Sequence, residues 1–350
     1  MDNPLISFAV GCYNQEAFIR EAVESAFTQT YSPLEIIISD DCSKDRTFDI
    51  VQRMVDAYKG PHTVRLNRNQ QNLGIGGNTN RAMELCRGEL VILAAGDDIS
   101  LPERTNAMVQ AWNESGRKAT SLYSRFVVID ELGHEAHETA DVGPANGQTR
   151  WVPEMGTVRG FLRRRKPHVA GCAHAISRKL FSVFGPLPAT VIYEDTALCF
   201  RTVLAGGFFA FIDAALVKYR RHGRNITFGL HQARPRSAAA FDDVQKKARC
   251  ELDRFVEVYK GFAADAERAV QQGLISSGEY PAVEENILKE IRRFELRKEL
   301  LFRGWLRRWS AFCELHRGSI RPREFLTQLP HLLPRAVHRN TVVALNRLHR

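Results

Sequence analysis

Pairs of adjacent carboxylates are the residues of this chain best suited to chemistry. Three such pairs stand out, namely Asp40-Asp41, Asp97-Asp98 and Glu194-Asp195. The first two pairs each follow an apolar run typical of a buried strand, and the third begins a pattern typical of an amphipathic helix. Carboxylates removed from water are costly unless they hold a cation, bind a ligand or transfer protons. The three pairs therefore indicate a functional site.

Asp97 and Asp98 close the segment 88–98, which reads GELVILAAGDD. Mg²⁺ and Mn²⁺ prefer hard oxygen ligands and usually bind one or two carboxylates together with substrate phosphates and water. An ion held here would neutralise a diphosphate and make it a better leaving group. The alternative is a pair of loop carboxylates that cap the helix expected after Pro102. The apolar strand that leads straight into the pair favours the metal site.

The other two acidic pairs each have two interpretations. Asp41 can accept the N–H of a nucleobase at the end of its strand. It can also belong to a turn, because the segment 40–45, DDCSKD, is rich in residues that bond their own backbone. One carboxylate of Glu194-Asp195 can act as general base on an acceptor hydroxyl. Taken alone, that pair is better explained by the favourable placement of acids at a helix N-terminus.

Glycines precede a helical pattern in the segment 72–84, NLGIGGNTNRAME. Glycines in such a place let backbone N–H groups approach a phosphate at the helix N-terminus. The spacing differs from that of a dinucleotide fingerprint, and no ribose-binding acid follows at the distance such a site needs. The segment alone therefore favours a glycine-rich turn, with Asn78 or Thr79 as helix cap.

The segment 219–227, YRRHGRNIT, gathers basic residues after a predicted strand. His222 can bind a metal or a phosphate there, and Arg220 can pair with a diphosphate. A lone histidine among arginines is also typical of an ordinary surface. The segment by itself does not decide between these interpretations.

Short apolar runs alternate with helical patterns along most of the chain. Strands are expected at 5–10, 34–39, 63–67, 89–95, 120–130 and 208–219. Helices are expected at 13–29, 47–58, 79–86, after Pro102 and at 193–205, with a loop at 131–150. This alternation predicts an α/β protein with a mostly parallel sheet flanked by helices. Ligands of such sheets lie at the carboxyl ends of the strands, where Asp41 and Asp97 fall.

We expect two parts, a sheet domain over 1–230 and a basic helical extension over 231–350. The net charge is +9, and residues 289–350 alone hold 15 Lys and Arg against 5 Asp and Glu. An aromatic stripe runs through the extension at helical spacing, formed by Phe302, Trp305, Trp309 and Phe312. This pattern suits either an interfacial helix on anionic lipid or a helix packed on the sheet domain. The packed helix is the favoured interpretation.

The cysteines and the hydropathy of the sequence indicate where in the cell the protein is expected. The seven cysteines are scattered singly without a CxxC, which favours reduced thiols over a disulfide framework or a zinc site. No apolar stretch approaches the roughly 20 residues that span a bilayer, and the N-terminus lacks the basic region of a signal peptide. We expect a cytoplasmic protein, or one peripheral on the inner membrane face. No nucleic-acid-reading motif is present in the sequence.

Together these segments resemble the family 2 glycosyltransferases of GT-A fold, over roughly residues 4–227. AVGCYNQE is similar to the family's opening strand and Tyr-Asn-x-Glu turn, and IIISDDCSKD to its Asp-Asp-Gly-Ser-x-Asp segment. NLGIGGNTNRAMELCRGEL resembles its Asn-x-Gly, Asn-x-Ala and Gly-Glu stretch, and VILAAGDD stands at its Asp-x-Asp metal motif. YEDTALCFR resembles its Glu-Asp motif, and VKYRRHGRNIT its closing Tyr-Arg-x-His segment.

Carried over position by position, the resemblance implies that Asp195 is the catalytic base. It also implies that Asp97, with His222 assisting, holds a divalent metal, Mn²⁺ or Mg²⁺. The residues implied to bind the donor are Tyr13, Glu16, Asp41, Asn72, Gly74, Asn80, Asp98 and Arg220. The chain departs from the family pattern at Ala95, which replaces the first acid of Asp-x-Asp. It departs again at Gly11, where proline is usual, and at Cys42, where glycine is usual.

The activity that the resemblance implies is inverting transfer of a sugar from a nucleotide-diphosphate sugar to an acceptor hydroxyl. The acceptor would be a saccharide or a lipid-linked saccharide, in the assembly of cell-surface polysaccharide or another glycan. The alternative is a non-catalytic nucleotide-sugar-binding or scaffold protein derived from a transferase, with Ala95 as the mark of decay. A nucleotidylyltransferase is disfavoured, because CYNQE stands where that class needs a glycine-rich basic loop.

Overall fold

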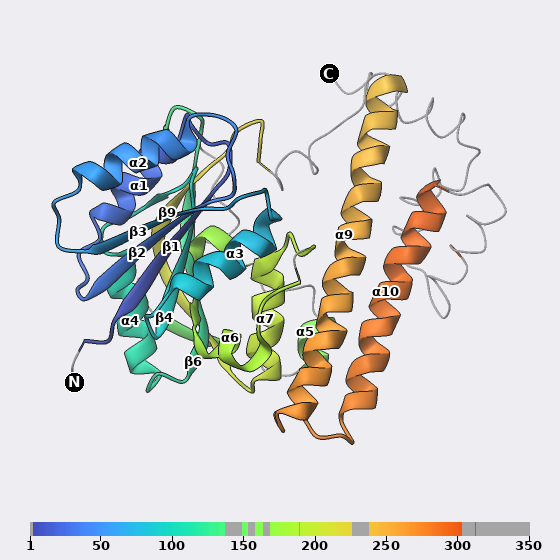
Figure 1. Cartoon of the computed structure of the whole chain (residues 1–350). Coiled ribbons are helices and arrows are strands. Elements are labelled where there is room, and N and C mark those ends of the chain that lie inside the picture. The colour runs from blue at the N-terminus through green and yellow to red at the C-terminus, as the bar shows by residue number, and fades with distance from the viewer. Residues whose placement is uncertain are drawn as a thin grey trace. The chain divides into compact units, whose positions relative to one another are not determined.

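The computed structural model describes residues 3–136, 149–152, 158–163, 169–188, 190–225, 238–302 and 312. The chain forms two compact units (Figure 1). The first unit comprises Met1–Arg221 together with Gly261–Glu284, and the second comprises His222–Lys260 together with Glu285–Arg350. Among the described residues, no helix is both long enough and apolar enough to cross a membrane.

A nine-stranded sheet forms the centre of the first unit, in the order β3-β2-β1-β4-β8-β6-β9-β5, with β7 paired to β9. Its strands are β1 (Ile6–Cys12), β2 (Leu34–Asp40), β3 (Thr63–Arg68), β4 (Leu90–Ala95), β5 (Ile99–Ser100), β6 (Ala119–Ile129), β7 (Thr149–Val152), β8 (His174–Ser177) and β9 (Phe208–Arg220). The β3-β2-β1-β4 pairs and the β6-β9 pair are parallel. Pairs that involve β5, β7 and β8 are antiparallel. The predicted α/β class with a mostly parallel sheet is confirmed.

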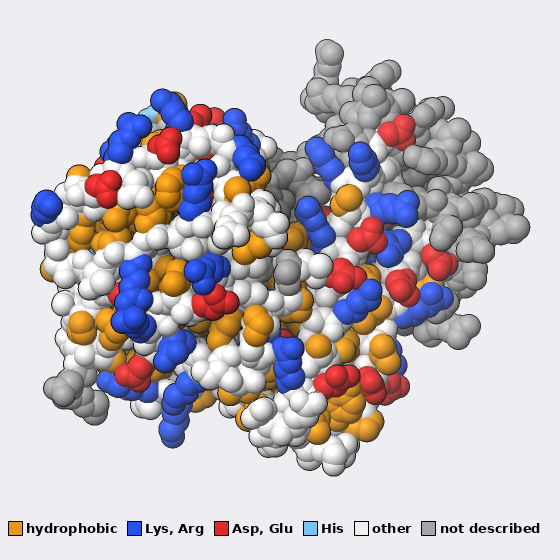
Figure 2. Space-filling model, in the orientation of Figure 1, with side chains coloured by type: hydrophobic (Ala, Val, Ile, Leu, Met, Phe, Trp, Pro, Cys, Tyr) orange, Lys and Arg blue, Asp and Glu red, His pale blue; other side chains and the backbone are white. Residues whose placement is uncertain are grey.

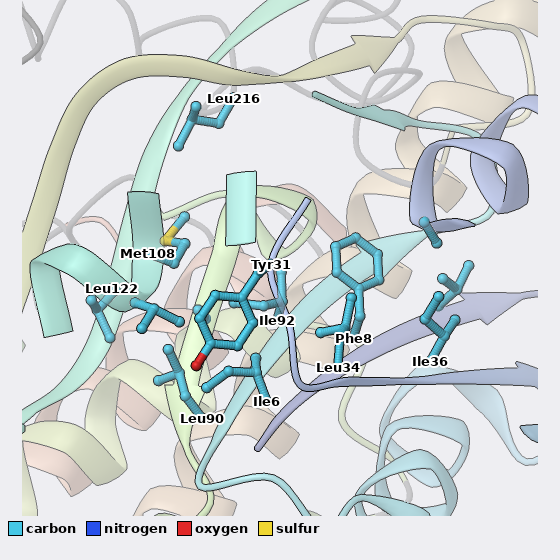
Figure 3. Close-up of a cluster of buried hydrophobic side chains, with 14 of the residues drawn as sticks. Ile6, Phe8, Tyr31, Leu34, Ile36, Leu90, Ile92, Met108, Leu122 and Leu216 are labelled. Carbon is cyan, nitrogen blue, oxygen red and sulfur yellow. The ribbon is translucent and has the colours of Figure 1, made fainter. Parts of the chain in front are cut away.

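Helices cover this sheet. They are α1 (Ile19–Phe27), α2 (Thr47–Ala57), α3 (Gly74–Leu85), α4 (Arg104–Glu114), α5 (Val158–Arg163), α6 (Lys179–Phe184) and α7 (Glu194–Leu204). A hydrophobic core joins the sheet to α1, α2 and α4, with Phe8, Ile36 and Ile92 among its buried strand residues (Figure 3). Side chains alternate along a strand, so Ser39 points to the opposite face, where it meets Asn78 of α3.

The register of the central strands sets the position of the loops that follow them. Cys12 lies opposite Asp40, and Gly11 lies between Ser39 and Ala95. Strands β1 and β2 are buried almost throughout, as expected of parallel strands covered on both faces. Because β1, β2 and β4 end at the same level, the loops after them begin side by side at one edge of the sheet.

Two helices begin at other places than the sequence pattern predicts. Helix α1 starts at Ile19, not near residue 13, because Asn14 has a left-handed backbone with φ of 52° and is held by the loop after β2. Helix α3 starts at Gly74, five residues earlier than predicted. Its first N–H groups are bonded to Asp41, so the glycines are the first turn of the helix and not a loop before it.

The long helix α9 (Ala238–Gln271) contributes residues to both units. Its last part belongs with the sheet, because Phe262 stacks on Phe200 at 4.1 Å between ring centroids and Asp265 pairs with buried Arg201. We predicted a boundary between residues 230 and 231, which lies outside the described residues. Residues 261–284 nevertheless join the first unit and not the extension.

In the second unit, α9 lies along α10 (Tyr280–Phe302). Phe255 stacks on Phe294 with 5.2 Å between ring centroids, and Lys298 pairs with Asp253 at 2.7 Å. The helical extension is therefore present. Basic and acidic side chains are interspersed on the face drawn in Figure 2. Trp305 and Trp309 of the predicted aromatic stripe lie outside the described residues.

Candidate active site

The loops after β1 and β2 are joined by hydrogen bonds at the carboxyl edge of the sheet. The N–H of Asn14 donates to Ser43 Oγ at 2.9 Å, and the N–H of Lys44 donates to Asn14 Oδ1 at 2.7 Å. The N–H of Glu16 donates to Asp45 Oδ2 at 3.1 Å. Burial alone would raise the pKa of Asp45, but hydrogen bonds from its neighbours outweigh that effect and lower it. The two loops therefore form one fixed surface.

Tyr13 and Glu16 both lie on this surface, but the ring of Tyr13 is exposed whereas the carboxylate of Glu16 is hydrogen-bonded to the neighbouring loop. The side chain of Tyr13 is 42% exposed, which leaves its ring open to stacking. The carboxylate of Glu16 accepts from the backbone N–H of Arg46 at 3.1 Å and from its Nε at 3.3 Å. Glu16 is thus committed to holding the two loops together, while Tyr13 remains available for a ligand.

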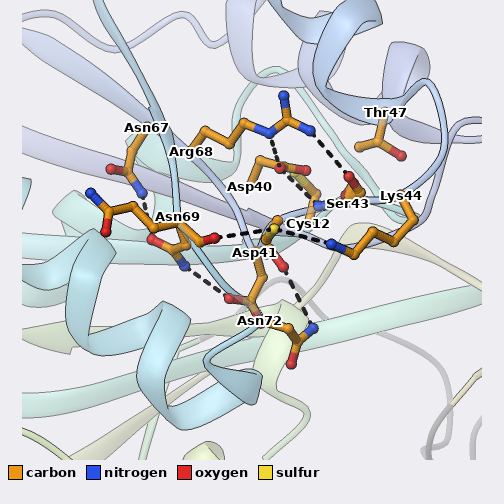
Figure 4. A network of polar contacts seen from close by, with 12 residues as sticks. Cys12, Asp40, Asp41, Ser43, Lys44, Thr47, Asn67, Arg68, Asn69 and Asn72 are labelled. Carbon is orange, nitrogen blue, oxygen red and sulfur yellow. Dashed lines mark hydrogen bonds and ion pairs between the residues drawn. The ribbon is translucent and has the colours of Figure 1, made fainter.

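Asp41 is buried, and its carboxylate caps helix α3 (Figure 4). Oδ1 accepts from Asn69 Nδ2 at 2.9 Å and from the N–H of Leu73 at 2.8 Å, and Oδ2 accepts from the N–H of Gly74 at 2.9 Å. A carboxylate offers about four acceptor sites. Three are taken by the protein, so one remains for a further donor such as a nucleobase N–H.

The backbone N–H groups of the glycine-rich turn are already bonded within the protein. Gly74 donates to Asp41, and Gly76 donates to the carbonyl of Val191 at 3.0 Å. These bonds leave no phosphate cradle at these two N–H groups. The predicted cap at Asn78 or Thr79 is wrong, because both residues lie inside helix α3 and Asn78 is bonded to Ser39. Asn72 is exposed beside Asp41, and its Nδ2 lies 3.5 Å from the carbonyl oxygen of Asp41.

Asn80 holds a distant segment and faces away from the loops described above. Its Oδ1 accepts from the N–H of Leu187 at 2.7 Å, and its Nδ2 donates to the carbonyl of Leu187 at 2.8 Å. Both ends of the amide are therefore bonded to one residue of the backbone. This geometry favours a positioning role over the donor contact that the family resemblance implies.

The second acidic pair is split between a buried and a half-buried carboxylate. Asp98 is 5% exposed, accepts from the backbone N–H of Arg220 at 2.8 Å and is hydrogen-bonded to the thiol of Cys172. Burial, and next the charge of Asp97, raise the pKa of Asp98 to about 8. Asp98 is therefore fixed inside the protein, and Asp97 is the member of the pair with a partly exposed side chain.

Arg220 is buried and is bonded to protein oxygens. Its Nε donates to the carbonyl of Asp97 at 3.0 Å, its Nη2 to Glu21 Oε2 at 3.0 Å, and its Nη1 to the carbonyl of Glu131 at 3.1 Å. With 1% of its surface exposed, Arg220 fixes the backbone of Asp97 and does not present its charge to a diphosphate. The family resemblance implies that Arg220 contacts the sugar donor. In the structure, its guanidinium instead contacts the backbone of Asp97.

The metal prediction rests on Asp97 and His222. Asp97 supplies a partly exposed hard-oxygen ligand, which fits Mg²⁺ or Mn²⁺ where substrate phosphates and water complete the shell. His222 is the first residue of the second unit, where its N–H donates to Asn225 Oδ1 at 2.6 Å. Within the described part of the chain, no group of three or more His, Cys, Asp or Glu residues has a metal-binding arrangement.

The third acidic pair begins α7 and lies against the short turn η2 (Gly171–Ala173). A Cβ on Gly171 would lie 2.4 Å from Oε1 of Glu194 and 3.8 Å from Cβ of Asp195, so a larger residue there would displace the Glu194 carboxylate. Cys172, the next residue, is bonded to Asp98. One short turn therefore touches both the second and the third acidic pair.

A continuous path of contacts links all three pairs. Asp41 bonds Gly74 at the start of α3, and the first turn of α3 bonds Val191, three residues before Glu194. Glu194 lies against Gly171, and the adjoining Cys172 bonds Asp98. The segments that carry the predicted site residues of the first unit thus meet at one edge of the sheet.

An amide network under this edge was not foreseen from the sequence (Figure 4). Ser39 Oγ donates to Asn78 Oδ1 at 2.7 Å, and Asn69 Nδ2 donates to the same oxygen at 2.9 Å. The signal available for it was the amide-rich segment 67–72, NRNQQN. These side chains fix the strand ends from which Asp41 projects.

Cys42 offers a test of backbone strain beside Asp41. Its φ of 60° lies in the left-handed region, which costs an L-residue about 1–2 kcal/mol. We expect Cys42→Gly to be more stable than Cys42→Ala by about 0.5–1 kcal/mol, after allowance for the larger unfolded-state entropy of glycine. Both variants lose the thiol, so urea unfolding of the pair isolates the backbone effect. An alanine variant as stable as the glycine variant would contradict it.

Glu194 predicts a pH dependence of stability. Burial, and next the charge of Asp195, raise the pKa of Glu194 to about 8, above the value of about 4.3 expected in the unfolded chain. The folded protein therefore holds a proton that the unfolded chain has released, so stability falls as pH rises from about 5 through about 8. Over this pH range, the Tm of Glu194→Gln should fall less than the Tm of the wild type. The Tm of Glu84→Gln, which changes an exposed site on α3, should fall as much as that of the wild type. Parallel curves for all three proteins would refute the assignment.

Comparison with known proteins identifies the family of this chain. Residues 7–185 match the family model described as glycosyl transferase family 2. An uncharacterized glycosyltransferase of Rickettsia felis is 28% identical over 227 residues, which cover 63% of this chain and 34% of that protein. EpsE of Bacillus subtilis, a putative glycosyltransferase, is 30% identical over 130 residues, which cover 37% of this chain and 46% of that protein. The chain thus spans less than half the length of these two relatives.

The fold is also found among solved structures. S. aureus TarS superposes with a TM-score of 0.56 at 16% identity, over 97% of this chain and 55% of that chain. Residues 1–349 of TarS, in complex with UDP-GlcNAc, superpose with a TM-score of 0.52 over 98% of this chain and 91% of that chain. The match to the family model covers more than half of the sequence, and the chain belongs to glycosyltransferase family 2.

Proposed function

We propose that this protein is an inverting glycosyltransferase that moves a hexosyl or related sugar from a nucleotide-diphosphate sugar to an acceptor hydroxyl. The observation that carries the proposal is the continuous path of contacts that joins the segments of Asp41, Asp97 and Asp195. Family membership supports it, as does the likeness in fold to TarS, which has been solved with UDP-GlcNAc.

In this proposal, the loops after β1 and β2 bind the nucleoside. The exposed ring of Tyr13 stacks on the base, and the remaining acceptor site of Asp41 takes a base N–H. The exposed amide of Asn72, next to Asp41, supplies a further polar contact. The nucleoside is thereby oriented by residues that the protein already holds rigid.

Asp97 would hold Mg²⁺ or Mn²⁺ against the diphosphate, and the ion would supply neutralisation of the leaving group. Arg220 fixes the carbonyl of Asp97, and Asp98 fixes the N–H of Arg220. We assign Arg220 and Asp98 as positioning residues for Asp97. This assignment replaces their predicted contact with the donor.

Asp195 acts as the general base in the proposed reaction. Its carboxylate takes the proton of the acceptor hydroxyl, and the hydroxyl oxygen attacks C1 of the sugar from the face opposite the diphosphate. The bond from C1 to the acceptor oxygen forms as the bond to the diphosphate oxygen breaks, so the anomeric centre inverts. Burial and the charge of Asp195 raise the pKa of Glu194, which favours the protonated form of Glu194 beside the proposed base.

A second candidate function is nucleotide-sugar binding without transfer. Ala95 favours it, because this residue stands at the end of β4 where the family has an additional acid. Asp97 and Asp195 both remain, and the contacts that fix their segments are complete. Turnover of a nucleotide sugar in the presence of Mn²⁺ separates the two functions.

We further propose a saccharide or lipid-linked acceptor, in glycan or cell-surface polysaccharide assembly. We also keep the prediction that the basic extension docks on an anionic membrane. The aromatic residues Trp305 and Trp309, on which that docking depends, lie outside the described residues. Liposome flotation of the full chain is the relevant measurement.

Asp195→Asn tests the base assignment. We expect kcat to fall by about 10²–10⁴-fold, because general-base assistance contributes that much. The Kd for the donor should stay within about twofold, since Asp195 acts on the acceptor, a loss of roughly 0.4 kcal/mol at most. Transfer assays and donor titration of the same preparation separate the two effects. A variant that transfers at the wild-type rate would exclude Asp195 as the base.

Asp97→Ala tests the metal assignment. A panel of nucleotide sugars with Mn²⁺ should raise the Tm of the wild type for the true donor, because ligand binding stabilises the folded state by mass action. We expect chelation to remove most of this gain, and Asp97→Ala to lose it in the presence of Mn²⁺. Asp56→Ala, at an exposed position on α2, is the matched control. An equal Tm gain in the two variants would argue against Asp97 as the ligand.

A further inference from the structure

The segment that leads into α7 is held by bonds from several directions. We define this approach segment as residues 185–188 and 190–193, which directly precede Glu194 and Asp195. From the side of α3, Asn80 bonds both backbone groups of Leu187, and Gly76 donates to the carbonyl of Val191. The approach segment thus connects the helix capped by Asp41 to the proposed base.

Arg201 holds the approach segment from within α7 itself. Its side chain is completely buried, with Nη1 donating to the carbonyl of Gly185 at 2.7 Å and Nη2 to the carbonyl of Pro186 at 3.0 Å. A planar guanidinium suits this task, because its fork of donors can bind two carbonyls and a carboxylate at once. Arg201 lies six residues after Asp195 on the same helix.

Asp265 of α9 completes the arrangement. Its Oδ2 accepts from Arg201 Nε at 2.8 Å and its Oδ1 accepts from Arg201 Nη2 at 3.0 Å. Arg268 lies 3.5 Å from Oδ1 and also donates to the carbonyl of Phe184. Helix α9 packs closely here, since a Cβ on Gly261 would lie 3.3 Å from Cγ of Pro188.

We infer that Arg201 and Asp265 are positioning residues that hold the base-bearing start of α7 against helix α3, whose N-terminus is capped by Asp41. Asp265 lies outside residues 7–185, the part of the chain that matches the family model. The inference rests on the proposed function for the role of Asp195. It adds that residues of the C-terminal third of the chain are required for the geometry of the reaction.

Asp265→Asn tests the inference, because asparagine keeps the size of the side chain and removes its charge. We expect kcat to fall by about 10- to 100-fold, since small misplacements of a reacting group have effects of that size. The Kd for a nucleoside diphosphate should change little. Arg201→Lys, which keeps the charge but loses the fork, should behave in the same way and provides a second variant if the first folds poorly.

A matched control comes from another buried Arg–Asp pair of the first unit, Arg125 and Asp213 on β6 and β9. Asp213→Asn also breaks a buried pair but leaves the approach segment untouched. It should lower Tm to a similar degree without the selective loss of kcat. If Asp265→Asn lowers kcat no more than Asp213→Asn does, a positioning role is excluded.

Amide hydrogen exchange makes the outcome independent of activity. In Asp265→Asn, exchange should accelerate in the approach segment and at the start of α7, and in Asp213→Asn it should not. Unchanged exchange in both variants would overturn the inference even if the wild type transfers sugar. Faster exchange in Asp265→Asn, together with a wild type that turns over no nucleotide sugar, would instead contradict the proposed function and leave the positioning contacts established.

Discussion

The buried carboxylate of Asp41 is the fixed point of this site. Taken out of water, it needs hydrogen-bond donors, and it finds them at the N-terminus of α3 and in the amide of Asn69. A helix N-terminus is the most favourable place for a negative charge that the backbone offers. This bond sets where α3 begins. The position of α3 in turn determines where Asn80 and Gly76 lie. Through their bonds it also determines the position of the segment that carries Asp195.

The acids of the site are divided between structure and chemistry. Asp98 and Glu194 have raised pKa values because they are buried next to another acid. Each adjoins a carboxylate that is only partly buried, Asp97 or Asp195. A protonated neighbour lets one charge persist where two would repel each other. In the second pair Asp98 is buried and Asp97 is partly exposed, whereas Glu194 and Asp195 of the third pair are both partly exposed.

The sheet and the convergence of the acids could be predicted from the sequence, because apolar strands and the carboxyl-edge rule depend only on local pattern. The roles of Asn80 and Arg220 could not. Whether an amide or a guanidinium faces a ligand or a backbone carbonyl depends on residues more than a hundred positions away, such as Leu187 and Asp97. A family motif fixes the residue type, whereas tertiary contacts decide what it touches.

The return of residues 261–284 to the sheet unit has a consequence for how such proteins can diversify. An extension joined only by a linker can be exchanged between relatives without harm to the catalytic part. Here the carboxylate of Asp265 would leave with the exchanged piece, and the guanidinium of Arg201 would stay behind, buried without its counter-ion. Exchange of the chain after the sheet would therefore be expected to destabilise the sheet unit itself.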